Sequence, residues 1–137
     1  MKSLKSLLIL GMLLLTSFLA CDPNAGDPVD PGDPRDKFLG DWNVSENCNR
    51  GNYFVTIYAD SGNSAQVMLH GFGNPGPNSD DAVGLVVSNK IIVSSQTIGE
   101  GWTISGEGTY QSNGTITWTY TLVIGPSTLD CSAVYSK

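Results

Sequence analysis

The stretch that decides the fold is Thr115-Ile116-Thr117-Trp118-Thr119-Tyr120-Thr121-Leu122, in which threonines alternate with large apolar residues. Successive side chains of a β-strand point to opposite faces, so this pattern predicts one buried face and one face in water. Asn113-Gly114 comes just before it and supplies the positive φ angles of a two-residue hairpin turn. We therefore expect the strand to pair with a preceding strand over residues 102–110.

The same period-two alternation continues over residues 38–137, and no window of a dozen residues supports an amphipathic helix. Clusters of Asn, Gly, Asp, Pro and Ser separate the alternating stretches, as expected of turns. Eight short strands result, and eight is the number that closes a small antiparallel up-and-down barrel. A sandwich of two sheets would accommodate the same count. The expected strands span residues 41–48, 53–59, 65–72, 83–87, 91–94, 102–110, 115–122 and 130–136.

Two of the three cysteines bear on whether the sheet closes. Cys48 ends the first expected strand and Cys131 begins the last. In a closed meander these two strands pair and the cysteines become neighbours, whereas in an open sheet they lie at opposite edges. We therefore expect a Cys48–Cys131 disulfide and a closed barrel, with two free or metal-bound thiols as the alternative.

The first 20 residues have the order of a secretory signal peptide, with Lys2 and Lys5 before an apolar run over residues 7–15. That run is shorter than the roughly 18 residues expected of a membrane-spanning helix. Ala20-Cys21 resembles the end of a bacterial lipobox, in which the cysteine thiol takes a diacylglycerol before cleavage. Cys21 is therefore the expected lipidation site, which places the protein in the cell envelope, anchored to a membrane. An ordinary signal peptide that leaves Cys21 as an unpaired thiol is the alternative.

Residues 21–37 form the expected link between the anchor and the barrel, which occupies residues 38–137. The link holds four Asp-Pro pairs, and Val29 is its only large apolar side chain before Phe38. Such a segment cannot bury enough surface to offset its ordering entropy, so we expect a disordered, extended tether. Removing the leader leaves five basic and thirteen acidic residues, a net charge of −8 that argues against nucleic acid as a partner.

Gly40-Asp41-Trp42 opens the first expected strand with the Gly-x-Trp that marks lipocalins and other calycin barrels. Together with the lipobox, the Asp-Pro tether, Ser95-Gln96-Thr97, Ser105-Gly106-Glu107-Gly108-Thr109 and the terminal stretch 131–137, it resembles the short lipocalin-like lipoproteins of Bacteroidetes-type bacteria. The resemblance covers essentially the whole mature chain and implies a lipocalin-like barrel, without any particular activity. The chain lacks the arginine that covers the tryptophan in larger lipocalins, and Lys137 is the candidate substitute.

Catalysis and metal binding find little support in the residue types. The single histidine, His70, is expected at the surface or the rim, and no Cys-His or Ser-His arrangement can be assembled around it. Glu100 and Glu107 bracket Trp102 as a conceivable sugar-cleaving pair, although charged residues near turns are usually solvated. We therefore interpret the protein as a non-enzyme and assign no catalytic residue, metal ligand or cofactor.

Binding is the better interpretation, because Glu46 shares its strand face with Trp42, which leaves two positions open for its side chain, one inward and one at the rim. A carboxylate among aromatic rings is costly unless it is paired or wet, which favours an aromatic cavity with one polar anchor near its mouth. Of the two positions for Glu46, the rim in water is the favoured one, because charged side chains are mostly exposed, and the inward carboxylate is the alternative that would make a binding site. The candidate ligand-binding residues are Glu46, Trp118, Tyr120 and Tyr135.

Two functions follow. The first is a lipid-anchored envelope barrel that binds a small or hydrophobic molecule without chemistry. The second is a surface interaction or inhibitor module whose barrel is filled, as Gly106 and Gly108 would permit, and whose loop over residues 74–81 contacts another protein. An enclosed interior volume would favour the first, and a packed interior the second.

Overall fold

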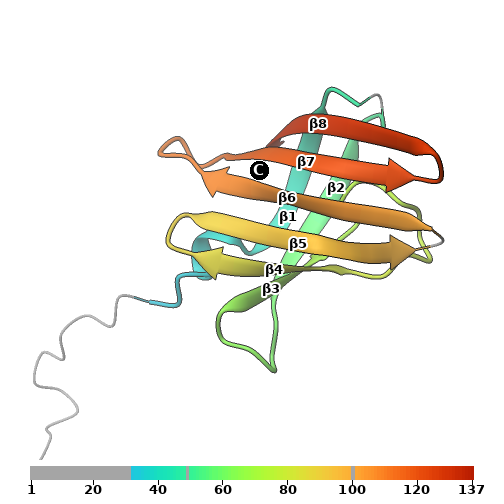
Figure 1. Cartoon of the computed structure of the whole chain (residues 1–137). Coiled ribbons are helices and arrows are strands. Elements are labelled where there is room, and N and C mark those ends of the chain that lie inside the picture. The colour runs from blue at the N-terminus through green and yellow to red at the C-terminus, as the bar shows by residue number, and fades with distance from the viewer. Residues whose placement is uncertain (1–31, 49, 100) are drawn as a thin grey trace, which may run out of the picture. The chain divides into compact units, whose positions relative to one another are not determined.

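The computed structural model describes residues 32–48, 50–99 and 101–137, which form a closed barrel of eight antiparallel strands (Figure 1). Each strand pairs with the next along the chain, and the last strand pairs with the first. The predicted eight-stranded up-and-down barrel of lipocalin-like type is therefore confirmed, and the sandwich is excluded. The expected leader, Cys21 and most of the tether lie outside the described residues.

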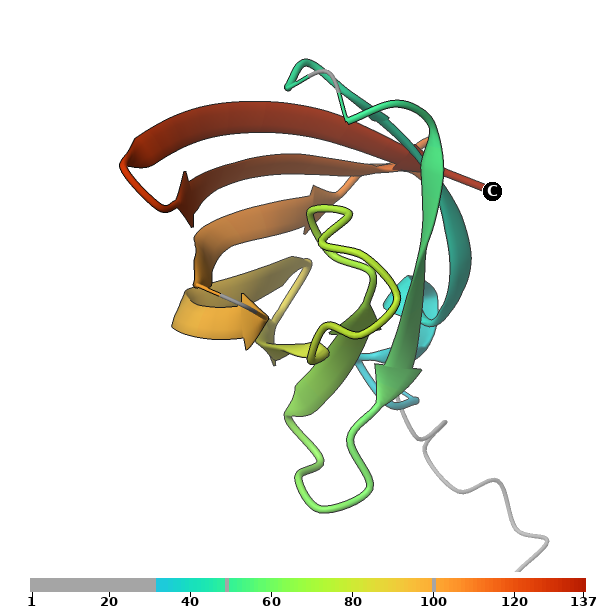
Figure 2. The same ribbon diagram turned by 90° about the vertical axis from the view of Figure 1, so that its right-hand side faces the viewer.

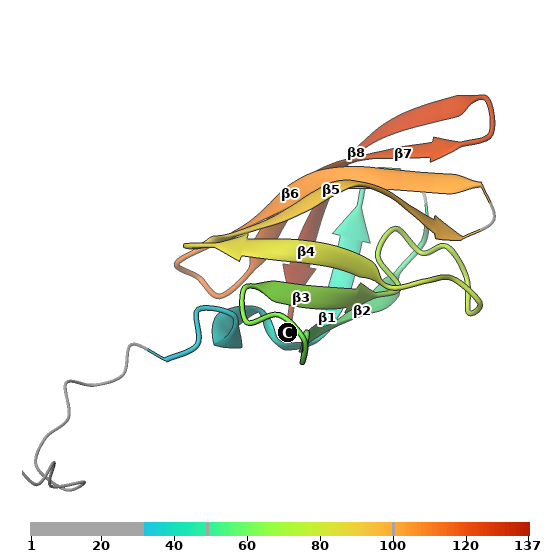
Figure 3. The same ribbon diagram turned by 60° about the horizontal axis from the view of Figure 1, so that its bottom comes forward.

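One short 3-10 turn precedes the strands, and the four later strands are longer than the four earlier ones (Figure 3). Among the described residues no helix is long and apolar enough to span a bilayer. The elements are η1 Asp36–Phe38, β1 Gly40–Glu46, β2 Tyr53–Ala59, β3 Gln66–His70, β4 Ala82–Val87, β5 Lys90–Gly99, β6 Trp102–Tyr110, β7 Ile116–Ile124 and β8 Ser127–Ser136.

The strand β5 is longer than the sequence predicted, because it does not end at Ser94. A register shift between Val93 and Gln96 places a bulge in the middle of the strand, which then continues to Gly99. A bulge sets two residues against one on the partner strand and so interrupts the alternation that the sequence shows. Beside the bulge, the Gln96 side chain bonds both backbone polar groups of Val83, as a paired strand would. Its Oε1 accepts from the Val83 N–H at 2.7 Å, and its Nε2 donates to the Val83 carbonyl at 2.9 Å.

The β6–β7 connection also differs from its prediction. The Gln111 N–H donates to the Thr115 carbonyl at 2.8 Å, so the loop contains the three residues 112–114 rather than two. Only Gly114 has a positive φ there, at 84°. This is the glycine position of a three-residue hairpin loop with a bulge, which the Asn-Gly pair alone does not distinguish from a two-residue turn.

The barrel end next to η1 is closed by side chains, of which Trp42 and Lys137 donate hydrogen bonds to backbone carbonyls. Phe38 is fully buried and packs edge-to-face against Tyr110, with ring centroids 5.8 Å apart. Its carbonyl accepts a hydrogen bond of 2.7 Å from Trp42 Nε1. Lys137 Nζ lies 4.5 Å from the centroid of the Trp42 ring and donates to the Leu39 carbonyl at 2.7 Å. Lys137 therefore covers this tryptophan, as the sequence suggested.

The seam of the barrel lies between β1 and β8, which pair from Asn43 opposite Ser136 to Glu46 opposite Ala133. Just beyond these pairs, a disulfide joins Cys48 to Cys131, with Cα atoms 5.6 Å apart. The bridge lies where a closed meander was expected to bring the two cysteines together.

Candidate functional site

The interior of the barrel is filled by aromatic side chains from β7, β8 and one loop. The Trp118 ring lies 5.4 Å from that of Tyr135 and 4.7 Å from that of Phe72, and Phe72 lies 5.3 Å from Tyr120. These four side chains are at most 3% exposed, so solvent reaches almost none of their surface. At this level the barrel is packed rather than hollow.

Two glycines of β6 allow the β7 rings to lie close against the barrel wall. Gly108 pairs with Trp118 and Gly106 pairs with Tyr120 across the β6–β7 ladder. A Cβ atom at Gly108 would overlap the Trp118 ring, and one at Gly106 would overlap the backbone and Cβ of Tyr120. Glycine is required at both positions by this close approach, which is the filled-core role that the sequence left open.

Phe72 reaches the interior from the β3–β4 connection, residues 71–81, which folds into the barrel mouth (Figure 2). The sequence predicted a strand to residue 72, and this was wrong by two residues. Gly71 adopts a φ of 84°, which ends the extended backbone after His70 and turns Phe72 into the core. The next residue, Gly73, is buried against the side chains of Ile104 and Leu122.

Four polar side-chain atoms inside the barrel are buried without a hydrogen-bond partner among the described residues. Leaving such a group unpartnered costs about 1–3 kcal/mol, and native proteins partner the large majority of them. The indole and the phenols supply donors and Glu46 supplies an acceptor. The four residues are those that the sequence proposed for ligand binding. The atoms are Glu46 Oε1, Trp118 Nε1, Tyr120 Oη and Tyr135 Oη.

Glu46 points inward at the margin of this cluster. Its other oxygen, Oε2, accepts a hydrogen bond of 2.9 Å from Tyr53 Oη. Burial raises the pKa of Glu46, although the Tyr53 bond and the nearby Arg50 act in the opposite direction. Burial also raises the pKa of Tyr53 and of Tyr135, so both phenols remain protonated at neutral pH. The carboxylate therefore lies in a poorly solvated environment with only one of its two oxygens bonded.

The sequence identified this cluster only in part, because it missed Tyr53 and Phe72. Tyr53 is directly opposite Val44 in the β1–β2 ladder, which turns its side chain toward the interior. Alternation within a strand does not give the register between strands, so the contact with Glu46 was not visible. A single Gly71 beside a large apolar residue was the one available signal for Phe72.

Contacts between loops hold the mouth of the barrel. Asn74 Nδ2 donates to the Arg50 carbonyl at 3.0 Å, and the Arg50 guanidinium lies 4.6 Å from the centroid of the Trp102 ring. At the base of the β3–β4 connection, Asp81 Oδ1 lies 2.7 Å from His70 Nδ1, and Asp81 Oδ2 accepts from Tyr58.

Asp81 and His70 lie on the outer wall and are in hydrogen-bond contact at that base. Burial would raise the pKa of Asp81, but the hydrogen bonds from Tyr58 and His70 outweigh it and lower that pKa. His70 is exposed, in agreement with the sequence.

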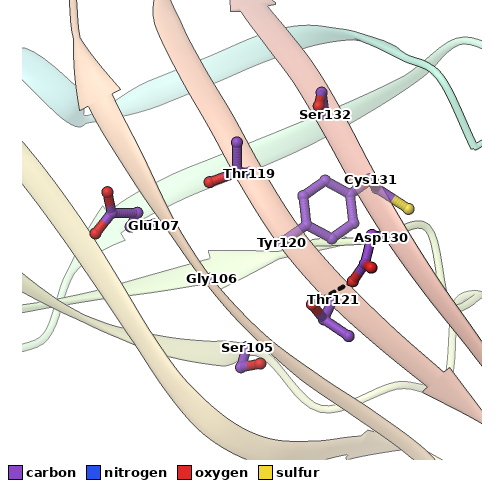
Figure 4. Close-up of a pocket in the computed structure, with 9 residues that line it drawn as sticks. All are labelled: Ser105, Gly106, Glu107, Thr119, Tyr120, Thr121, Asp130, Cys131 and Ser132. Carbon is purple, nitrogen blue, oxygen red and sulfur yellow. Dashed lines mark hydrogen bonds between the residues drawn. The ribbon is translucent and has the colours of Figure 1, made fainter.

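A shallow depression on the outer wall of β6, β7 and β8 offers a surface of different chemistry (Figure 4). Thr121 Oγ1 donates to Asp130 Oδ1 at 2.9 Å, and Glu107 Oε1 accepts from Lys90 Nζ at 3.1 Å. Glu100, the other half of the conceivable sugar-cleaving pair, lies outside the described residues. The depression is lined by Ser105, Gly106, Glu107, Thr119, Tyr120, Thr121, Asp130, Cys131 and Ser132.

Within residues 32–48, 50–99 and 101–137, no three histidine, cysteine or acidic side chains come together in a group that could hold a metal ion. Comparison of the chain with protein families, with curated proteins and with solved structures gives no match.

Proposed function

We propose that this protein is a lipid-anchored cell-envelope barrel that binds a small, mainly hydrophobic molecule inside the barrel without catalysing a reaction. The observation that carries the proposal is the set of four unpartnered polar atoms in the aromatic interior. A buried polar group without a partner destabilises the folded state, so replacing it by an apolar group of the same shape is nearly neutral or stabilising. A purely structural core would therefore gain from phenylalanine at positions 120 and 135. Tyrosine at both positions fits a site whose partner arrives from outside.

Ligand binding is tested with a hydrophobic fluorescent probe titrated against the full chain. We expect a saturable one-site isotherm with quenching of tryptophan emission, because the probe would lie against Trp118. Trp118→Ala should change the affinity more than tenfold, about 1.4 kcal/mol. Thr119→Ala, an exposed change on the same strand, is the matched control and should leave the affinity unchanged. Absence of saturable binding across fatty acids, sterols, haem-like probes and small aromatic molecules would contradict the proposal.

The anchor rests on Ala20-Cys21 after the apolar run of the leader. Cys21→Ser should release the protein from membranes, because acyl chains supply about 0.8 kcal/mol per buried methylene. Membrane fractionation and metabolic labelling with palmitate measure this directly. Unchanged fractionation together with absent labelling would remove the anchor from the proposal and leave the binding site untouched.

The packed interior favours a second candidate, a surface interaction module. The groove between the β3–β4 connection and Trp102, lined in part by Pro75, Pro77 and Ser79, is the contact surface nearest to the loop that the sequence singled out. A folded wild-type protein that binds none of the probes would favour this candidate over an interior site.

A further inference from the structure

We propose that Phe72 is a built-in stopper, and that the ligand is a single-ring aromatic molecule with a hydroxyl or amine group that takes the place of the Phe72 ring. The inference rests on the proposed function, and it adds both the class of ligand and the way in.

Phe72 is unusual among the buried apolar residues of the described chain, because it comes from a connection between strands. Every other member of that core belongs to a strand, apart from Phe38 in η1. A strand side chain leaves the interior only if the barrel opens, since its backbone is held on both sides by ladder hydrogen bonds. Phe72 leaves the interior when its own loop moves.

The loop around Phe72 has the backbone of a hinged segment. Glycine adopts positive and negative φ with similar ease, so a change of backbone conformation at these positions costs little. Hinges of moving loops are commonly a few such residues. The His70–Asp81 contact fixes the base of the loop, while the Asn74–Arg50 contact is the tie across the mouth. The positive-φ residues are Gly71 at 84°, Gly73 at 78°, Asn74 at 54° and Gly76 at 102°.

The space that the Phe72 ring fills defines the size and shape of the ligand. An apolar cavity of about 150 Å³ in another protein binds benzene, so the space under one displaced phenyl ring fits one aromatic ring. The Trp118 and Tyr120 rings already lie at tilts of 55° and 47° to the Phe72 ring, with centroids at distances typical of aromatic pairs. A ring in that position keeps both contacts.

The unpartnered atoms of Trp118 and Tyr120, whose rings contact Phe72, and of Tyr135, whose ring contacts Trp118, define the chemistry of the ligand. Trp118 Nε1 donates only, whereas the hydroxyls of Tyr120 and Tyr135 donate and accept. A ligand that satisfies them carries a donor and an acceptor, as a phenol does. The Glu46 carboxylate and the acidic chain disfavour an anionic ligand such as benzoate.

The test compares phenol, benzene and benzoate in calorimetric titrations of the full chain and of Phe72→Ala. Removing the stopper should raise the affinity for phenol at least tenfold, because the ligand no longer competes with the protein's own ring. Phenol should bind more tightly than benzene, and benzoate should bind most weakly. Phe54→Ala is the matched control, since Phe54 is 67% exposed on the outer wall, and it should leave the phenol affinity at the wild-type value.

A second variant keeps the test decisive if Phe72→Ala does not fold. Asn74→Gly removes the tie to Arg50 but tolerates the positive φ and leaves the core intact. It should speed phenol association several-fold in stopped-flow tryptophan fluorescence without lowering the melting temperature.

The possible failures are distinguishable. Probe binding by the wild type with the same affinity and rate in the folded variants would overturn the stopper and leave the proposed function in place. If neither the wild type nor any variant binds a probe, the proposed function fails, and the stopper fails with it.

Discussion

Trp42 and Trp118 both face the interior and are both 1% exposed, yet only the indole N–H of Trp42 has a hydrogen-bond partner among the described residues. Trp42 Nε1 donates to the Phe38 carbonyl at 2.7 Å, and Lys137 covers its ring. Trp118 Nε1 has no partner among the described residues and lies between the rings of Tyr135 and Phe72. The indole at the Trp42 end of the barrel is thus fully hydrogen-bonded within the described residues, whereas the indole of Trp118 is not.

Under the proposed function, this difference separates residues that hold the fold from residues that would bind a ligand. The free energy of a buried, unpartnered donor or acceptor is unfavourable by about 1–3 kcal/mol, so the Trp118 region gives up stability that the Trp42 region keeps. Regions where a fold departs from full satisfaction of its polar groups are typically functional. The following changes test how far the two regions differ.

The largest effect is expected at the seam between β1 and β8. A disulfide holds the strands there, whereas packing holds the barrel end around Trp42. The Cys48–Cys131 bridge closes a loop of 83 positions, for which chain entropy gives up to about 4–5 kcal/mol. Reduction or Cys48→Ser with Cys131→Ser should therefore lower the melting temperature markedly. Non-reducing peptide mapping should recover one peptide that contains both cysteines.

Hydrogen exchange locates the effect of losing that bridge. After reduction, amides of β1 and β8 near the cysteines should exchange faster, whereas those near Phe38 and Trp42 should keep their protection. An unchanged melting temperature, or alkylation of both Cys48 and Cys131 in the native protein, would contradict a covalent seam.

The direct comparison of the tryptophans comes next, with Trp42→Phe set against Trp118→Phe. Both changes shrink a buried ring, but only Trp42→Phe leaves a carbonyl, that of Phe38, without its donor. Trp42→Phe should therefore cost about 1–3 kcal/mol more than Trp118→Phe in chemical denaturation. Equal losses would mean that the Trp118 N–H is satisfied in solution.

The sequence predicted the fold better than it predicted the site, for a physical reason that these residues illustrate. The alternation along Ile116 to Leu122 and the turn residues reflect local backbone geometry. The positions of Cys48 and Cys131 at strand ends reflect closure of the barrel. The contact between Tyr53 and Glu46 depends on strand register, and the position of Phe72 depends on the φ of Gly71. The hydrophobic pattern of the sequence determines neither the strand register nor the φ of Gly71.

Among the tyrosines, Tyr135→Phe and Tyr53→Phe should have opposite effects on stability. Tyr135 Oη has no partner among the described residues, so its removal should be neutral or stabilising by up to about 1 kcal/mol. Tyr53 Oη donates to Glu46 Oε2 at 2.9 Å, and its loss would remove that donor from a half-buried carboxylate. Urea denaturation measures both, and a clear loss of stability in Tyr135→Phe would show that its hydroxyl has a partner in solution.

The smallest expected effect is the pH dependence that Glu46 confers. Because burial raises its pKa above 4.5, the folded state binds this proton more tightly than the unfolded state does. The resulting stability is fully present below pH 4.5 and is lost as the pH rises through the raised value. Glu46→Gln cannot ionise and still offers an oxygen to Tyr53, so its stability relative to wild type should increase between pH 4.5 and 7.

Glu107→Gln, at an exposed ion pair with Lys90, is the control and should change stability by less than about 1 kcal/mol at either pH. A Glu46→Gln difference that stays flat or falls over this range would mean that the carboxylate is as well solvated as in water, and the distinction between the two ends of the barrel would then rest on Trp118 and the tyrosines alone.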